Sequence, residues 1–201
     1  MKSISKLLSL AFALTALAST ASAQDYDTRV RVQVKDDSVS HVSVVGELPN
    51  LSTAPGQVLV GVGYGMSGNK YEVGVHLGGM TMPGAAATAL VDVRGTVTLT
   101  DNLYSWVNLR LLGLEDTDSM RVYGFGTVNY KLPTVVSFLA VGVETEETFS
   151  TFASGDAFGK TDVSVGPSVH VHVLKGVRLE GAYQVHSELG NQAWARLNVM
   201  L

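Results

Sequence analysis

Residues 56–80 read GQVLVGVGYGMSGNKYEVGVHLGGM and contain two alternating runs that are joined by a short polar break. In the first run, Val60 and Tyr64 belong to an apolar set that alternates with glycines. In the second run, Val73 and Val75 alternate with polar residues and glycine. Only a β-strand places successive side chains on opposite faces, so this stretch predicts a hairpin with one apolar face and one face of polar residues and glycine.

The same period of two extends along most of the chain and predicts about ten strands. The predicted strands cover residues 38–48, 56–66, 70–80, 87–99, 103–114, 120–132, 134–146, 160–173, 177–187 and 192–201. Residues 24–37 are either an N-terminal extension or an extra strand, because Thr28 to Lys35 also alternates. The breaks between strands are short and long in turn, so we expect tight turns at one end of the sheet and longer loops at the other.

Residues 1–23 are expected to be a secretory signal peptide, because Lys2 and Lys6 precede an apolar run that ends in small residues at positions 21–23. Without this segment, 12 basic residues stand against 18 acidic ones, a formal charge of −6, which argues against nucleic-acid binding. The remaining chain has no apolar stretch near the ~20 residues of a transmembrane helix. Its lack of cysteine excludes disulfides and thiolate metal sites.

Alternation alone fits both a transmembrane barrel and a soluble β-sandwich, since both have one apolar and one polar face. The predicted strands are near the ~9 to 11 residues that cross a bilayer when tilted, and their apolar faces are mainly Val, Leu and Ala, which suits lipid contact. Aromatic residues near the tight turns are predicted to form an interfacial girdle: Tyr64, Tyr71, Tyr104, Trp106, Tyr130 and Phe138. The predicted fold is all-β: an antiparallel, up-and-down transmembrane β-barrel over residues 38–201, with about 10 strands and a range of roughly 8 to 11.

The strings VGVGYGMSGNKYEVGVHLGG at 60–79 and VRLEGAYQV at 177–185 resemble the glycine-and-tyrosine hairpins of small outer-membrane β-barrel proteins of Gram-negative bacteria. The resemblance covers residues 38–201, and within these barrel proteins the chain is similar to the YfaZ-like group. The resemblance implies an outer-membrane location, contact with the lipid bilayer and lipopolysaccharide, and insertion by the outer-membrane insertion machinery. Such barrels usually end in an aromatic residue, whereas the outward set of the last predicted strand here is Leu197, Val199 and Leu201.

The inward faces are predicted to carry charges of both signs: Glu72, Asp92, Arg94, Arg110, Arg121, Lys131, Glu144, Asp162, Arg178, Glu180 and Arg196. Counting from the tight turns places the following residues opposite one another: Asp92 and Arg110, Arg121 and Glu144, His170 and Glu180, His172 and Arg178. Because unpaired charge in a narrow lumen is costly, the pairing predicts a closed, self-neutralised lumen. A structural or interaction role is therefore favoured over that of a general porin.

Two groups of residues are candidates for chemistry. His170 and His172, two positions apart on one strand, could share a metal ion, but no third ligand is fixed by the spacing. The favoured interpretation is that they are polar fillers of the lumen, and no cofactor is predicted. His186 and Ser187 near the outer rim, with Glu180 as an acidic partner for a histidine, are the candidates for a catalytic site.

These residues leave two alternatives to a structural barrel. The first is a small barrel enzyme that modifies outer-membrane lipid, although adjacent residues such as His186 and Ser187 point to opposite sides of a strand. The second is a soluble periplasmic β-sandwich that acts as a binding protein.

A set of acidic residues is expected to face outward at the loop end, where it could bind divalent cations or keep the loops solvated. These residues are Glu47, Glu115, Asp116, Asp118, Glu146, Glu147, Asp156 and Glu188.

Overall fold

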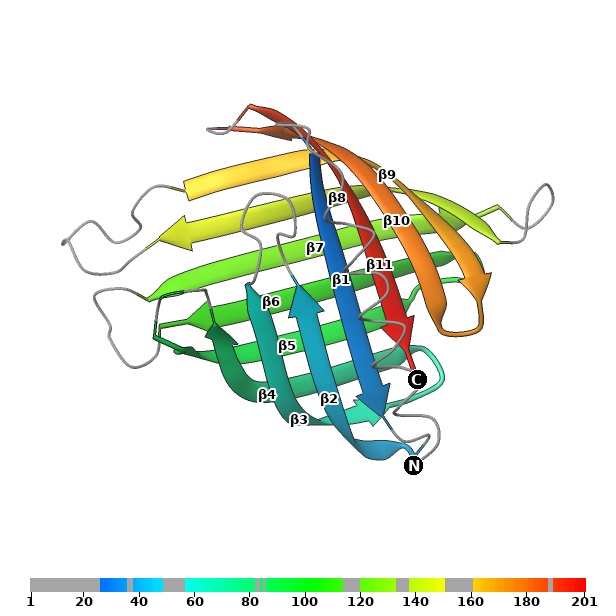
Figure 1. The fold of residues 1–201 in the computed structure, drawn as a ribbon. Helices are drawn as coiled ribbons and strands as arrows, with labels where there is room; N and C mark the ends of the chain where they lie inside the picture. The colour runs from blue at the N-terminus through cyan, green and yellow to red at the C-terminus, as the bar shows by residue number, and fades with distance from the viewer. Residues whose placement is uncertain are drawn as a thin grey trace.

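The computed structural model describes residues 26–35, 38–48, 57–81, 84, 86–113, 120–132, 138–150, 161–187 and 190–201, so the predicted signal peptide lies outside the described residues. Eleven strands form in these ranges (Figure 1): β1 (Tyr26–Lys35), β2 (Ser40–Leu48), β3 (Val58–Ser67), β4 (Tyr71–Thr81), β5 (Thr88–Thr98), β6 (Leu103–Leu112), β7 (Arg121–Lys131), β8 (Leu139–Ser150), β9 (Thr161–Leu174), β10 (Val177–His186) and β11 (Asn191–Met200). No helix in the described ranges is long and apolar enough to cross a membrane.

The strands close into one barrel in sequence order, with each strand paired to its chain neighbours and β1 paired to β11 (Figure 1). This confirms the predicted barrel and its strand range, and it replaces the alternative of a two-sheet sandwich. All the pairs are antiparallel except β1 with β11, which is parallel. Residues 26–35, left open from the sequence, are thus the strand that closes the barrel. The odd number of strands is the cause of the parallel pair, since an up-and-down barrel with an odd count cannot alternate all the way round.

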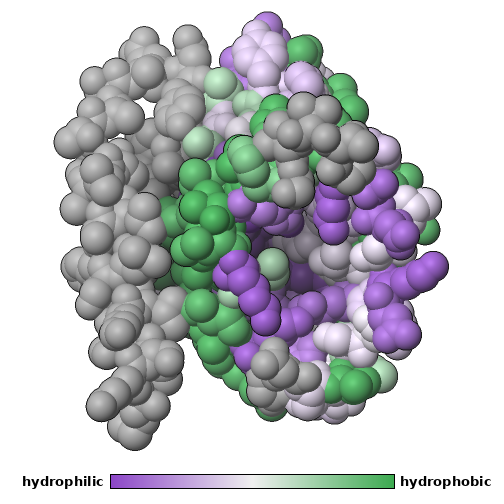
Figure 2. All heavy atoms as spheres, turned by 90° about the vertical axis from the view of Figure 1, so that its right-hand side faces the viewer, coloured by the Kyte–Doolittle hydropathy of each residue, from purple (hydrophilic) through white to green (hydrophobic). Residues whose placement is uncertain are grey.

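The wall has an apolar outside and a polar inside, as the period of two predicts. On β4, Val75 is 47% exposed and Leu77 is 65% exposed, whereas His76 between them is fully buried. Figure 2, which views the molecule from the right-hand side of Figure 1, shows hydrophilic side chains around a hollowed centre. The tight turns lie at this end, which is called the turn end below, and the longer connections lie at the opposite loop end. The outward Val and Leu side chains suit contact with lipid tails.

The predicted aromatic girdle is partly wrong. Tyr64, Tyr71 and Tyr130 are about half exposed on the outer wall, as a girdle requires. Tyr104 and Trp106, by contrast, share the inward face of β6 with Arg110, because residues two and four positions apart on a strand lie on the same side. Tyr104 is buried in the lumen, so neither aromatic residue of β6 meets the membrane interface.

The predicted register of β7 and β8 is also wrong. The predicted strand 134–146 assumed a two-residue turn, but β8 starts at Leu139 and continues to Ser150. Lys131 therefore pairs with Ala140, and Glu144 lies opposite Thr127 rather than opposite Arg121. The longer connection moves every residue of β8 toward the turn end relative to the prediction.

Glycines on β3 and β4 allow the two strands to approach closely. A Cβ built on Gly78 would overlap the carbonyl oxygen of Val60 and lie 2.6 Å from the Cα of Gly61 on the paired strand. A Cβ built on the neighbouring Gly79 would have only the Thr88 carbonyl oxygen near it, at 3.4 Å. Glycine is thus required at position 78 because the backbone of β3 lies too close to leave room for a side chain. Any larger residue would need a shift of β3.

Replacing Gly78 by alanine is therefore expected to lower the free energy of unfolding by about 1 to 3 kcal/mol, the usual cost of overpacking. Urea unfolding of the purified protein in detergent, followed by tryptophan fluorescence, measures this loss. Gly79→Ala is the matched control and is expected to leave stability nearly unchanged. Equal effects of the two substitutions would show that β3 and β4 are not in close contact at Gly78.

Candidate functional site

The lumen is the candidate functional site, because the inward strand faces bring charged and polar side chains together there. All five histidines of the chain occupy inward positions, on β2, β4, β9 and β10. The buried charged residues are Arg29, Arg31, Glu47, Asp92, Arg94, Arg110, Glu144, Glu180 and Arg196. Burial of a charge is costly unless the charge is paired, so the ion pairs among these residues define the site.

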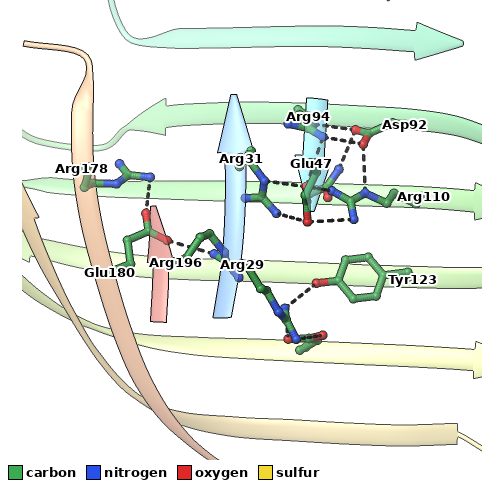
Figure 3. A network of polar contacts seen from close by, with 12 residues as sticks. Arg29, Arg31, Glu47, Asp92, Arg94, Arg110, Tyr123, Arg178, Glu180 and Arg196 are labelled. Atoms are coloured by element: carbon green, nitrogen blue, oxygen red, sulfur yellow. Dashed lines mark hydrogen bonds and ion pairs between the residues drawn. The ribbon is translucent and has the colours of Figure 1, made fainter. Parts of the chain in front are cut away.

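Five side chains form what we call the central arginine layer (Figure 3): Arg31 of β1, Glu47 of β2, Asp92 and Arg94 of β5, and Arg110 of β6. Arg31 Nε lies 2.8 Å from Glu47 Oε2, and Arg110 also binds Glu47. Asp92 accepts hydrogen bonds from Arg94 Nε at 2.8 Å and from Arg110 Nε at 2.9 Å. None of the five side chains is more than 6% exposed.

The register of the strands explains why these five residues meet. Arg31 lies directly opposite Glu47 in the β1–β2 pair, and Asp92 lies directly opposite Arg110 in the β5–β6 pair. Arg94 is two residues after Asp92 and therefore shares its face. Charge-assisted hydrogen bonds of this kind are the strong ones in proteins, so the layer holds four strands in a fixed relation across the lumen.

A second group, which we call the Glu180 cluster, lies on β9 to β11. Glu180 contacts Arg178 at 2.5 Å, Arg196 at 3.0 Å and His170 at 3.7 Å. The guanidinium of Arg196 also lies 4.1 Å from the ring centroid of Trp194, a cation–π distance. Figure 3 shows the two arginines on either side of the Glu180 carboxylate. One carboxylate thus serves two arginines and a histidine.

An additional ion pair lies nearer the loop end. Arg29 Nη1 lies 2.8 Å from Glu146 Oε2, and Arg29 Nη2 lies 3.0 Å from Glu146 Oε1. The Tyr123 hydroxyl accepts a hydrogen bond from Arg29 Nη1 at 3.4 Å. This two-point contact between a guanidinium and a carboxylate links β1 to β8, a strand on the other side of the lumen that is not paired with β1.

Most of the expected charge pairs of the lumen are present. Asp92 lies opposite Arg110, His170 lies opposite Glu180, and His172 lies opposite Arg178. The pairing of Arg121 with Glu144 is wrong, because the β7–β8 connection is longer than the predicted turn. Glu144 Oε1 instead accepts a hydrogen bond from Gln184 Nε2.

Two carboxylates that the sequence placed among the outward acidic residues of the loop end face the lumen instead. Glu47 belongs to the central arginine layer, and Glu146 binds Arg29. Each has an arginine partner on β1, the segment left unassigned: Arg31 for Glu47 and Arg29 for Glu146. The signal was present in the alternation of Arg29, Arg31, Gln33 and Lys35 with valines. The other members of the acidic set lie outside the described residues, apart from Glu147 on the outward face of β8.

The metal candidates His170 and His172 occupy consecutive inward positions of β9. His170 Nδ1 lies 3.2 Å from the Tyr104 hydroxyl, and His172 lies opposite the cation Arg178. In the described part of the chain, no three His, Cys, Asp or Glu side chains are grouped so as to hold a metal ion. The contacts of His170 are those of a polar side chain packed within the lumen.

The structure does not bring together the three catalytic candidates. His186 Nδ1 lies 2.6 Å from Asp162 Oδ2, and Ser187 Oγ donates to Asp162 Oδ1 at 3.3 Å. The serine therefore contacts the carboxylate and not the imidazole, whereas a triad needs a serine bonded to the histidine. Glu180 is six residues before His186 on the same strand, roughly 20 Å away at the usual strand rise.

Two cavities lie at opposite ends of the lumen, with the central arginine layer between them. The turn-side cavity has a volume of about 270 Å³ and is lined by residues that include Arg31, Trp106, Arg178 and Asn198. The loop-side cavity has a volume of about 190 Å³ and is lined by residues that include Arg29, Glu47 and Arg110. The two cavities have no lining residue in common.

The comparisons with known proteins support the fold. No family model matches the sequence, and no curated protein is similar to it. Among solved structures, the barrel is similar to that of the NanC porin, with a TM-score of 0.50, 11% sequence identity, and coverage of 85% of this chain and 94% of that chain. At this identity the similarity concerns the fold alone. It is consistent with an outer-membrane barrel.

Proposed function

We propose that this protein is an integral outer-membrane β-barrel whose lumen is closed, and that it has a structural or interaction role rather than that of a general porin. The observation that carries the proposal is the central arginine layer, in which buried side chains from β1, β2, β5 and β6 meet across the lumen. The strand number supports it, because barrels of 8 strands are filled by side chains and open channels are typical of 16 to 18 strands.

The energetics of the layer also support closure. An ion that crosses the lumen must pass Glu47, Asp92 and their arginine partners, which bind one another in preference to a mobile ion. Breaking one such buried contact leaves an uncompensated charge, which costs several kcal/mol. A passage of this kind is closed on the timescale of conduction unless the layer rearranges.

We further propose that residues 1–23 direct export and that the barrel resides in the outer membrane of a Gram-negative bacterium. Its partners are then the lipid bilayer, lipopolysaccharide and the outer-membrane insertion machinery. The pattern of the first 23 residues and the apolar outer wall support this proposal. Divalent cations at the acidic loops are a further proposed partner. Glu47 and Glu146 are not among the residues proposed to bind them, because their carboxylates bind arginines in the lumen.

Conductance in planar lipid bilayers tests closure. The wild-type protein is expected to insert without producing stable channel steps in neutral salt. A triple variant, Arg31→Ser, Glu47→Ser and Arg110→Ser, removes three long side chains from the layer without changing the wall. It is expected to conduct ions, because water and salt can then fill the middle of the lumen.

The matched control is Lys35→Ser with Glu72→Ser, which removes an ion pair of the turn end whose side chains are 23% and 28% exposed. This double variant is expected to remain closed. Stable conductance by the wild-type protein would overturn the closed lumen, whatever the variants do. A triple variant that folds and stays closed would show that another part of the lumen forms the barrier.

A further inference from the structure

The turn-side cavity differs from the rest of the lumen in the balance of charge around it. It opens toward the end of the barrel that Figure 2 shows, where hydrophilic side chains surround a hollow. Arg31 of the central arginine layer and Arg178 of the Glu180 cluster both line it, so the cavity lies between the two groups. Each of the two groups therefore contributes to the potential that a molecule in the cavity would experience.

Both groups contain more arginines than carboxylates. The central arginine layer pairs three arginines with Glu47 and Asp92. The Glu180 cluster pairs Arg178 and Arg196 with one carboxylate. Each group thus carries a formal excess of one positive charge, and an uncompensated buried charge is costly without a counter-charge.

Two other carboxylates near the two groups make no direct ion pair with the arginines of either group among the described residues. Glu72, which also lines the cavity, is bound by Lys35 at 2.5 Å. Glu144 hydrogen-bonds to Gln184 and forms no ion pair with any residue that the structure describes. A mobile anion in the cavity could neutralise the excess, because the cavity is the space that both groups border.

Unpartnered hydrogen-bond donors on two residues that line this space support the same conclusion. Asn198 is 5% exposed and lines the cavity, and its Nδ2 has no hydrogen-bond partner among the described residues. Arg178 also lines the cavity, and its Nε is buried and unpartnered in the same ranges. An unmade hydrogen bond of a buried donor costs about 1 to 3 kcal/mol, and an acceptor-rich ligand removes that cost.

We propose that the turn-side cavity is a binding site for a small oxyanion of the phosphate class, held by Arg31, Arg178 and Asn198. A phosphate group presents acceptor oxygens in several directions, which suits donors that come from β1, β10 and β11. The volume of about 270 Å³ is below that of typical sites for drug-sized ligands, which indicates a small ligand. This inference goes beyond the closed barrel proposed above, because closure requires no ligand.

Titration of the purified protein in detergent with inorganic phosphate, at constant ionic strength against chloride, tests the site. Trp106 lines the cavity, so its fluorescence is expected to change in a saturable manner. Asn198→Ala and Arg178→Gln are each expected to weaken binding by about tenfold or more, as the loss of one hydrogen bond to a charged group predicts. A parallel titration with glycerol 3-phosphate distinguishes a free phosphate ion from a phosphate ester such as a lipid headgroup, since the tighter ligand identifies the source.

Lys175→Gln is the matched control, because it removes a positive charge from the exposed turn of the same hairpin without touching the cavity. It is expected to bind phosphate like the wild-type protein. A heat-dependent gel shift identifies the variants that fold, and Arg178→Gln keeps the test decisive if Asn198→Ala does not fold. The proposal is overturned if neither phosphate compound gives saturable binding, or if the folded cavity variants and Lys175→Gln bind alike.

Discussion

Replacing Glu47 by alanine is expected to lower the free energy of unfolding by about 3 to 5 kcal/mol, the cost of removing one partner from a buried ion pair. Glu47 contacts three arginines of the central arginine layer, and its side chain is 2% exposed. Without it, Asp92 is the only carboxylate left in the layer. Urea unfolding in lipid vesicles, followed by tryptophan fluorescence, measures the loss.

The matched control is Glu72→Ala. Its partner Lys35 and the glutamate itself are partly exposed at the turn end, so the pair is expected to contribute only about 0 to 1 kcal/mol. A similar loss of stability in the two variants would mean that the central arginine layer is hydrated and does not behave as a buried network.

Replacing Val75 by arginine is expected to destabilise the barrel by about 2 to 4 kcal/mol, because a charge on the lipid-facing wall is most costly near the bilayer midplane. Val75 is near the middle of β4 and points outward, next to the buried His76. The folded fraction in lipid vesicles, measured by the heat-dependent gel shift, is expected to decrease in parallel.

Thr81→Arg provides the control, since Thr81 lies on the same face of the same strand but at its loop end. Near the interface such a charge costs about 0 to 1 kcal/mol. If arginine at position 75 were tolerated as well as arginine at position 81, the outer wall of β4 would not be in contact with lipid tails.

The sequence predicts the barrel well because its main signal is physical and repeated. Alternation of Val with polar residues or glycine identifies ten of the eleven strands, and short turns fix the register of several pairs. The turn predicted at residues 100–102 is the clearest example, since counting from it correctly places Asp92 opposite Arg110. Local geometry is sufficient wherever the turn between two strands is short.

The errors occur where local geometry does not determine the outcome. The β7–β8 connection is longer than the Leu132–Pro133 turn that the sequence suggested, so Glu144 is opposite Thr127 and not Arg121. The closing strand β1 has a clear alternation, but its pairing with β11 depends on closure of the whole barrel. No counting along the chain reveals a partner about 170 residues away.

The candidate site was less predictable for the same reason. The pairing of Glu180 with His170 follows from one hairpin, and the sequence identifies it. The central arginine layer needs β1 to face β6 across the lumen, a relation of the barrel as a whole. Glu47 and Glu146 were thus placed with the loops, although both bind arginines from strands that are distant in sequence.

The parallel pairing of β1 with β11 also determines the sidedness of the protein. Strands that run side by side in the same direction start at the same rim, so Tyr26 of β1 lies at the loop end and Met200 of β11 lies at the turn end. In a membrane, a peptide tag inserted just before β1 and a tag attached just after β11 would be displayed on opposite faces. With an even number of strands, both tags would appear on the same face.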